Sequence, residues 1–496
     1  MSRTIIYYKT YPLSSSDGAL SSPTSVAASV PMHDNNRNNI ATMDAISLGR
    51  PAKIRKVIQE APSWICSTSS MAIRTKGKNN SIQNIIQPIV DEIKSGFQRI
   101  DEKEPVSLAT ADSAFPHLPP CTEATEAIVQ ALIQTPHTAC YTHASGSPEA
   151  RRAIALHHSF PGHSLNPQHV IVTNGCSGAL ELTLSSILDE GTLLLVPQPG
   201  LPLYEEIAES HGANVVRYRL DPNRSWECDM DNLEKIMAGV SNKSPIGAMV
   251  INNPSTHGSV FSEDHLEQLL DFALKHHIPI VADEVYGNLT FGSNRFHPIA
   301  KVAVKHGRRV PVITTSGLSK QFMLPGWRIG WCTFQDNIYG SLREVERGAH
   351  RIAKFQHGVS HLQQSAIPIM LSQSTAGLVN WKENLRATLE RQATILCSNL
   401  DNCHCLSLAP PQGSMYTIVD LDLAPLDIDS DIEFAQKLVQ EENVFVLPGS
   451  SFGVTDTFRV AFSASETTLE MASQRIANFC SRHAKIELRE EKGRES

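Results

Sequence analysis

The stretch that decides the fold ends an apolar run and places a lysine directly after it. It reads Val310-Pro311-Val312-Ile313-Thr314-Thr315-Ser316-Gly317-Leu318-Ser319-Lys320. The apolar run predicts a buried strand, and the Gly and Ser residues predict a turn at its end. An amine in such a place is partly removed from water, so it loses its charge more easily and can act as a nucleophile. Arg328, eight residues after Lys320, carries a fork of donors suited to a phosphate.

Short apolar strands alternate with helix-periodic segments on both sides of this stretch. The strands are expected at 170–174, 193–196, 214–218, 247–251, 279–282, 310–314 and 328–333, and the intervening helices at 203–211, 230–238 and 265–276. This alternation predicts an α/β fold: a three-layer, mainly parallel sheet with helices on both faces. Strands at 415–419, 444–449 and 457–462, with helices at 432–441 and 466–483, predict a second, smaller α+β domain.

The composition divides the chain into five expected segments. They are a flexible or targeting extension (1–60), an N-terminal segment that packs with the small domain (61–110), the large cofactor-binding domain (111–345), a connecting helix with the small C-terminal domain (346–484), and a frayed charged tail (485–496). The first 16 residues contain Arg3 and Lys9 but no acid, as in an organelle transit peptide. We therefore expect a cytoplasmic protein, or a mitochondrial or plastid one if the extension is cleaved.

The bulk composition excludes several classes of protein. A net charge of −8 over 496 residues, without a basic tract, argues against a nucleic-acid partner, and no apolar run reaches the length of a membrane span. The ten cysteines are scattered, as reduced thiols of an intracellular enzyme are. Cys403-His404-Cys405 is too cramped for a tetrahedral metal site and has no partner pair, so we expect no metal.

Polar residues follow several of the expected strands, and in parallel sheets ligands bind at these strand ends. Asn253, Asp283, Tyr286 and Lys320 all occupy such positions. Pyridoxal 5′-phosphate would use an amine for its aldehyde, a buried carboxylate for its ring nitrogen and donors for its ring oxygen. The arginine after the lysine and the small-residue turn opening a helix at Asn174 would suit its phosphate.

Each of these residues also has a purely structural interpretation. Asp283 could cap a helix, Tyr286 could belong to the core, and Asn253-Pro254 could form only a turn. Arg459, in an otherwise apolar strand, is the best candidate for a substrate carboxylate but could also extend to the surface. The joint pattern, in this order and at these strand ends, favours function.

The motifs that carry a family resemblance run through most of the chain. They are Asn174-Gly175-Cys176-Ser177, Pro197-Gln198-Pro199-Gly200, Asn252-Asn253-Pro254-Ser255, Ala282-Asp283-Glu284-Val285-Tyr286-Gly287, Gly317-Leu318-Ser319-Lys320, Pro325-Gly326-Trp327-Arg328-Ile329-Gly330-Trp331 and Phe458-Arg459-Val460. From about Trp64 to His483 the chain resembles the fold-type-I aminotransferases, and within them it is most similar to the tyrosine aminotransferase branch.

The resemblance implies a role for each residue and a homodimer with active sites at the subunit interface. Lys320 would carry the internal aldimine, Asp283 would pair with the pyridine nitrogen, and Tyr286 and Asn253 would contact the ring oxygen. Four residues would surround the phosphate, with Tyr141 reaching it from the other subunit: Cys176, Ser177, Ser319 and Arg328. Arg459 would hold the substrate carboxylate.

Three departures from the family pattern lie around the substrate. Leu201 occupies the place of the aromatic ring that usually stacks on the cofactor, and Tyr204 is expected to lie too far along the helix to replace it. The usual Asn-Pro-Ser-Asn-Pro segment is shortened here at Thr256-His257, and the turn near the substrate carboxylate is Ala111-Asp112-Ser113.

We therefore expect a transaminase that moves the amino group of an L-amino acid, aromatic by resemblance, to 2-oxoglutarate by way of pyridoxamine phosphate. A carbon–sulfur lyase or an aminocyclopropane-carboxylate synthase-like enzyme is the alternative on the same scaffold. A non-catalytic cofactor-binding protein is a third reading, which the intact Lys320, Asp283 and Arg459 disfavour.

Overall fold

The structure is a computed structural model that describes residues 68–75, 103–111, 118–134, 136–240, 245–336, 340–372 and 375–485. The chain divides into two units, Met1–Cys66 and Ser67–Ser496, and all described residues belong to the second. The extension predicted at 1–60, most of the helix-periodic region after Trp64, and the tail beyond Lys485 lie outside the described residues. What we expect of cleavage and location stays a prediction.

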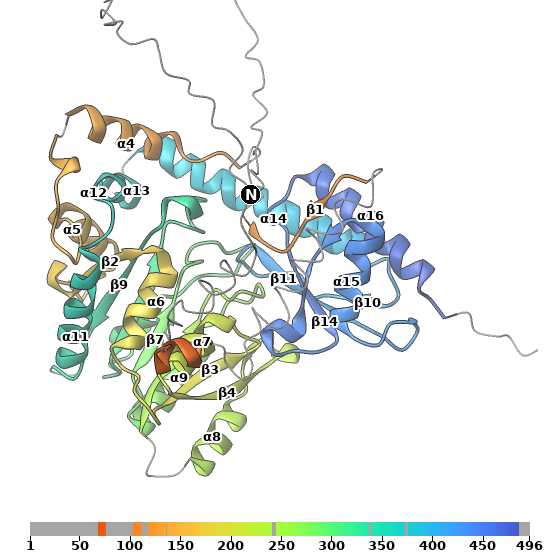
Figure 1. Ribbon diagram of the computed structural model, residues 1–496, viewed down its shortest axis with the longest axis horizontal. Coiled ribbons are helices and arrows are strands. Elements are labelled where there is room, and N and C mark those ends of the chain that lie inside the picture. The colour runs from red at the N-terminus through yellow and green to blue at the C-terminus, as the bar shows by residue number, and fades with distance from the viewer. Residues whose placement is uncertain are drawn as a thin grey trace, which may run out of the picture. The chain divides into compact units, whose positions relative to one another are not determined.

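A mainly parallel eight-stranded sheet forms the centre of the large domain (Figure 1). Its spatial order is β2 (Val170–Asn174), β9 (Ile329–Gln335), β8 (Val312–Gly317), β7 (Ile280–Asp283), β6 (Ile246–Asn252), β3 (Leu193–Gln198), β4 (Asn214–Asp221) and β5 (Glu227–Cys228). Strands β8, β7, β6, β3 and β4 run parallel to one another, as continuous apolar strands do. The expected three-layer α/β fold is thereby confirmed.

Strand β9 is the main exception, because it runs antiparallel to both β8 and β2. The connection from β8 to β9 contains the lysine turn and a short 3₁₀-helix, Pro325–Trp327. This connection holds no crossover helix, and without one the chain returns antiparallel.

Alternate residues of the central strands face two helical layers. Leu194 and Val196 of β3 share a cluster with α6 (Gly175–Ser185) and α7 (Pro202–Ser210). Leu195, between them, packs in a second cluster with three helices, α8 (Met230–Gly239), α9 (Glu263–His276) and α10 (Ile299–Lys305). This period of two shows that both faces of the sheet are covered by helices. A ligand pocket is therefore expected at the carboxyl ends of the strands.

Further helices lie beside the sheet and lead to the small domain. They are α2 (Ser70–Arg74), α4 (Thr122–Gln134), α5 (Pro148–His157), α11 (Arg343–Ala353), α12 (His361–Gln364), α13 (Ile367–Leu371) and α14 (Ala376–Leu400). Leu378, near the start of α14, packs in a cluster with α4, α5 and α13, whereas Leu389 and Leu396 belong to a cluster that includes side chains of the small domain, such as Phe434 and Phe479. Helix α14 therefore connects the two domains, as Figure 1 shows. Among the described helices, none is both long and apolar enough to cross a membrane.

The small domain is a four-stranded antiparallel sheet with helices packed on it. The sheet order is β10 (Leu406–Ser407), β11 (Tyr416–Leu421), β14 (Thr457–Ala461) and β13 (Leu447–Pro448), and the later helices are α15 (Asp431–Glu442) and α16 (Glu466–Arg482). The single strand expected at 444–449 is divided: β12 (Val444–Phe445) pairs with β1 (Val106–Ser107), and β13 pairs with β14. The strand divides at Val446 because its two halves satisfy their hydrogen bonds with different partners.

Candidate active site

The strand ends bring the predicted residues to one edge of the large sheet. In the register of the parallel strands, Asn252 pairs with Asp283 and Asp283 with Thr315. Lys320 follows β8 by three residues and is half-buried. Three segments that are far apart in the sequence therefore end side by side, as ligand sites in such sheets require.

Asp283 is a buried carboxyl group with three donors and no cation. Its side chain is 2% exposed. Its Oδ2 accepts a hydrogen bond from the Tyr204 hydroxyl at 2.6 Å, and its Oδ1 accepts from the Cys176 thiol at 3.5 Å and from the Val285 amide at 3.3 Å. Burial raises the pKa of Asp283, although these donors act in the opposite direction. Among the described residues no Lys, Arg or His pairs with it, so a protonated ring nitrogen would supply the missing positive partner.

Tyr204 is a site residue that the sequence did not predict in this role. It lies in the first turn of α7 and is fully buried, and burial raises the pKa of its phenol so that the hydroxyl remains a donor. That Tyr204 lies too far along the helix to replace the stacking ring stays a prediction, and its contact with Asp283 is a separate role. Its position three residues after Leu201, in a helix that starts at Pro202 and packs on the sheet, could have indicated the contact.

The site predicted for the cofactor phosphate consists of the start of helix α6 and a glycine that lies close to Arg328. Helix α6 begins at Gly175, where Asn174 provides no side-chain cap, so backbone N–H groups of its first turn are left for an anion. A Cβ on Gly175, whose φ is +73°, would lie 2.4 Å from the Arg328 guanidinium. The glycine therefore lets the guanidinium approach the start of the helix. Ser177 and Arg328 line one cavity of about 490 Å³, which does not include Lys320 or Asp283.

Tyr416 connects the lysine to the small domain. Its hydroxyl oxygen accepts hydrogen bonds from Lys320 Nζ at 3.2 Å and from the Ala111 amide at 3.2 Å. Burial alone would raise the pKa of this phenol, but the charges of Lys320 and Arg459, together with these hydrogen bonds, outweigh it and lower the pKa. Sequence analysis missed Tyr416; a hydroxyl at the start of an apolar strand is the feature that could have indicated it.

Arg459 is a buried cation held between two aromatic rings. Its guanidinium carbon lies 4.2 Å from the ring centre of Tyr416 and 4.3 Å from that of Phe452. It donates to the Ala109 carbonyl at 3.3 Å, its Nε has no hydrogen-bond partner, and no carboxylate among the described residues pairs with it. Burial lowers its pKa. A fork of this kind is available to a substrate carboxylate.

The remaining predicted residues lie at varying distances from this centre. Tyr286 is buried with its ring nearly perpendicular to that of Tyr416. The Asn253 amide oxygen accepts a hydrogen bond from the Phe261 amide, which leaves the Asn253 N–H donors for a further partner. Leu201 is partly buried against the core, and Ser319 is buried. Tyr141 is 91% exposed. The Cys176 thiol contacts Asp283, which leaves its backbone amide for the phosphate.

The structure also places residues from two of the three segments that depart from the family pattern. His257, in the shortened loop, is buried, and burial followed by the charge of Arg459 lowers its pKa to about 3, so the ring is neutral. Ala111 donates its amide to Tyr416 and therefore acts through that phenol, while Asp112 and Ser113 lie outside the described residues.

This set of donors fits pyridoxal 5′-phosphate. A carboxyl without a cation, an amine at a strand end, and a helix start with a neighbouring guanidinium match its ring nitrogen, its aldehyde and its phosphate. The fold and the site thus define a pyridoxal-phosphate-dependent enzyme.

Comparison with known proteins gives the family. The chain belongs to the class I and II aminotransferases, whose family model matches residues 103–476. Tyrosine aminotransferase of Dictyostelium discoideum is 33% identical over 416 residues, which cover 83% of this chain and 96% of that protein. An S-alkyl-thiohydroximate lyase of Arabidopsis thaliana is 30% identical over 379 residues, which cover 75% and 79%. The crystal structure of tyrosine aminotransferase from Leishmania infantum superposes with a TM-score of 0.75 at 29% identity, over 85% of this chain and 100% of that one.

Proposed function

We propose that this aminotransferase moves the amino group of an aromatic L-amino acid to 2-oxoglutarate. The observation that carries the proposal is the buried Arg459 guanidinium, which stacks on Tyr416 and has no carboxylate partner among the described residues, while the Tyr416 hydroxyl contacts Lys320. A buried charge without a partner is costly, by several kcal/mol. A carboxylate bound in a bidentate manner would remove that penalty, and both an amino acid and a 2-oxo acid carry one.

The aromatic surroundings of the site support an aromatic donor. Tyr286, Tyr416 and Phe452 present ring surface near Arg459, and aromatic pairs are favourable beyond the area that they bury. The similarity to tyrosine aminotransferases of two organisms, over at least 83% of this chain, supports the same choice.

The residues divide the chemistry between them. The bound cofactor supplies the aldehyde that receives the amino group and a ring that holds the electron pair released at the α-carbon. Asp283 holds a proton at the ring nitrogen, and the hydrogen bond from Tyr204 fixes the orientation of its carboxylate. Lys320, once freed by the substrate, takes the α-proton and returns it, while the Tyr416 oxygen positions its Nζ.

A carbon–sulfur lyase is the second candidate, and the similarity to the Arabidopsis lyase favours it. Both reactions begin with removal of the α-proton by the lysine, so the residues around Lys320 serve either one. The difference lies in the fate of the nitrogen. A transaminase delivers it to the oxo acid as glutamate, whereas a lyase expels a sulfur leaving group and yields no glutamate.

Product analysis of the purified enzyme tests the proposal. With tyrosine or phenylalanine and 2-oxoglutarate, we expect glutamate and the aromatic 2-oxo acid in equal amounts. Lys320→Ala should abolish both products, whereas Lys301→Ala, at an exposed position of α10, should change neither. Glutamate formed only with non-aromatic donors would overturn the aromatic assignment. Release of a thiol from a sulfur-containing donor without glutamate would establish the lyase.

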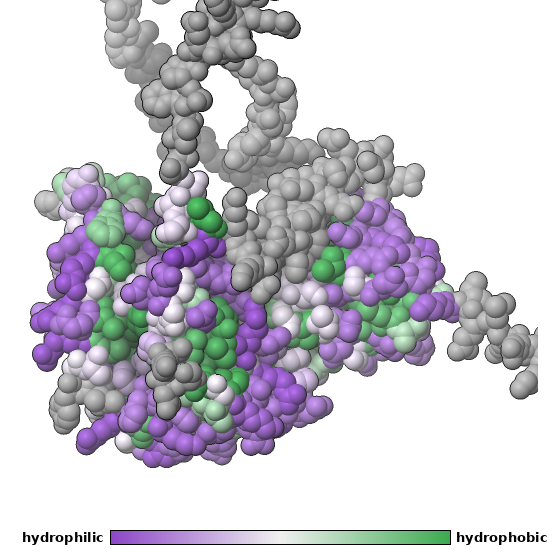
Figure 2. Space-filling model, turned by 60° about the horizontal axis from the view of Figure 1, so that its bottom comes forward, coloured by the Kyte–Doolittle hydropathy of each residue, from purple (hydrophilic) through white to green (hydrophobic). Residues whose placement is uncertain are grey.

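We also propose that the enzyme is a homodimer. Apolar side chains of α4 are exposed, among them Leu132 and Ile133, and so are Tyr141 and Phe355. Figure 2 shows apolar areas between hydrophilic ones on the face that it presents. A second copy of the chain would cover such areas. Light scattering should give twice the chain mass, and Leu132→Glu should shift the protein toward the monomer; a monomeric, fully active wild type would contradict the proposal.

A further inference from the structure

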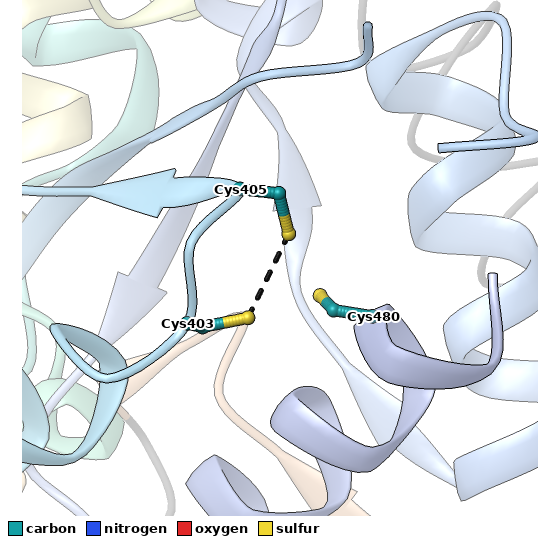
Figure 3. A group of neighbouring side chains, drawn as sticks. All are labelled: Cys403, Cys405 and Cys480. Atoms are coloured by element: carbon teal, nitrogen blue, oxygen red, sulfur yellow. Dashed lines mark hydrogen bonds between the residues drawn. The ribbon is translucent and has the colours of Figure 1, made fainter. Parts of the chain in front are cut away.

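Three cysteine thiols meet in the small domain, away from the residues described above (Figure 3). Cys403 and Cys405 lie in the turn between α14 and β10, and Cys480 lies in the last turn of α16. The three sulfur atoms lie within 4.8 Å of one another, and those of Cys403 and Cys405 are 3.6 Å apart. All three residues are at most 9% exposed.

The structure thereby supplies the partner that the sequence did not reveal. We expected no metal site because Cys403-His404-Cys405 is too cramped for a tetrahedral site and has no partner pair in the sequence. The third thiol comes from the C-terminal helix, which packs against α14 and directs Cys480 toward the turn, as Figure 3 shows. The expectation rested on spacing along the chain, and a ligand from a distant helix is invisible to it.

Hydrogen bonds couple the three thiols to one another. Hydrogen bonds from Cys405 and Cys480 lower the pKa of Cys403, and the nearby charge of His404 acts in the same direction. The hydrogen bond to Cys403 raises the pKa of Cys405, and that of Cys480 is raised as well. The cluster belongs to an apolar core that includes Leu400, Leu406 and Phe479. A negative charge in such surroundings is stabilised by a cation.

We propose that Cys403, Cys405 and Cys480 bind one soft divalent cation with a filled d shell, of the Zn²⁺ class. Tetrahedral coordination at a metal–sulfur distance of about 2.3 Å separates the sulfurs by about 3.8 Å, close to the separation of the two turn cysteines. Three thiolates with a divalent ion carry a net charge of −1, which is less than with a monovalent ion and less unfavourable to bury. A water molecule would complete the coordination.

Binding is a substitution of protons by metal. The ion forms three metal–sulfur bonds, and every thiol that is protonated before binding passes its proton to solvent. The bound ion would fasten α16 to the turn before β10, whose strand pairs with the Tyr416-bearing β11. It would thus act on the stability of the small domain and not on the chemistry at Lys320.

Cd²⁺ titration of the reduced, cofactor-loaded enzyme tests the site. Cys66→Ser and Cys140→Ser should be introduced first, because Cys140 is an exposed thiol and Cys66 lies outside the described residues. We expect one Cd²⁺ per chain, the ultraviolet charge-transfer absorption of three thiolates, release of protons in proportion to the Cd²⁺ bound, and a higher melting temperature.

Removal of one ligand should weaken binding at least about 100-fold, the upper end of what loss of an outer-shell partner costs. Cys480→Ala tests this directly, and Cys405→Ser, which preserves the side-chain volume, serves if the first variant fails to fold. Cys228→Ala, at a solitary buried cysteine, is the matched control and should bind Cd²⁺ like the parent. Binding that Cys480→Ala leaves unchanged, or no binding by the reduced enzyme, would overturn the proposal.

Discussion

Replacement of Tyr416 by phenylalanine tests the role of the hydroxyl group separately from that of the aromatic ring. The hydroxyl oxygen accepts one hydrogen bond from Lys320 Nζ and one from the Ala111 amide, each at 3.2 Å. Phenylalanine removes both and keeps the ring against Arg459. A hydrogen bond to a charged group contributes about 1.5–3 kcal/mol. If this energy positions the lysine during proton transfer, kcat should fall about 10- to 150-fold.

Steady-state kinetics with tyrosine and 2-oxoglutarate measure the effect. We expect kcat to fall while KM for both substrates stays near the wild-type value, because Arg459 and its ring partner remain. The pH profile of kcat should also lose one ionisation, since positive neighbours lower the pKa of Tyr416 in the intact enzyme. A residue with a merely structural role would leave that profile unchanged.

Tyr218→Phe is the matched control. Tyr218 is buried in β4 and donates to the Val250 carbonyl at 2.6 Å, so its loss should lower stability and leave kcat unchanged. An unchanged kcat in Tyr416→Phe would refute the positioning role. A raised KM with kcat preserved would show that the phenol serves Arg459 instead.

Three further variants test the other groups of the site. Arg459→Lys should raise KM for both the amino acid and the oxo acid by about 10- to 100-fold in steady-state assays, because a point charge replaces a bidentate fork. Tyr204→Phe should weaken cofactor affinity by about tenfold in titrations of the cofactor-free enzyme, because Asp283 loses a 2.6 Å hydrogen bond. Glu284→Gln should flatten the pH dependence of stability in urea unfolding, because burial raises the pKa of Glu284 from 4.5 to about 8.

The sign of the Glu284 effect follows from proton counting. Between about pH 4.5 and pH 8 the folded carboxyl keeps its proton and the unfolded one has lost it. The unfolding free energy therefore falls as pH rises through this window, by at most about 5 kcal/mol, and is level above it. Glutamine keeps the acceptor for the Ile299 amide and cannot ionise. Parallel stability curves for the two proteins would refute this account. An unchanged KM in Arg459→Lys would contradict the role of Arg459 in binding the carboxylate. An unchanged cofactor affinity in Tyr204→Phe would contradict the role of Tyr204 beside Asp283.

The position of the cofactor site could be predicted because the site lies at the ends of the parallel strands. A continuous apolar run that stops at a polar residue marks both the strand and its edge, as at Asn253, Asp283 and Lys320. Parallel register then brings these ends together without any further information. The physical rule is local, and one sequence is sufficient to apply it.

The contacts of Tyr416, Tyr204 and Cys480 could not be predicted in the same way. Tyr416 begins an apolar strand in another domain, and its partner Lys320 is determined by how that domain packs on the large sheet. Tyr204 depends on the tilt of α7, and Cys480 on the packing of α16. These are long-range arrangements, so pattern and propensity can mark a candidate residue but cannot identify its partner.

The sheet register explains why recognition of the carboxylate and positioning of the lysine are coupled. Ile418 of β11 lies opposite Arg459 of β14, and strand periodicity places Tyr416, two residues earlier, on the same face as Ile418. The guanidinium and the phenol therefore form one unit on the small sheet, facing a lysine that belongs to the large one. A substrate carboxylate that binds Arg459 acts on the group that orients Lys320. Arg459→Lys is for this reason expected to lower kcat somewhat as well as raise KM, whereas Tyr416→Phe leaves the carboxylate site in place.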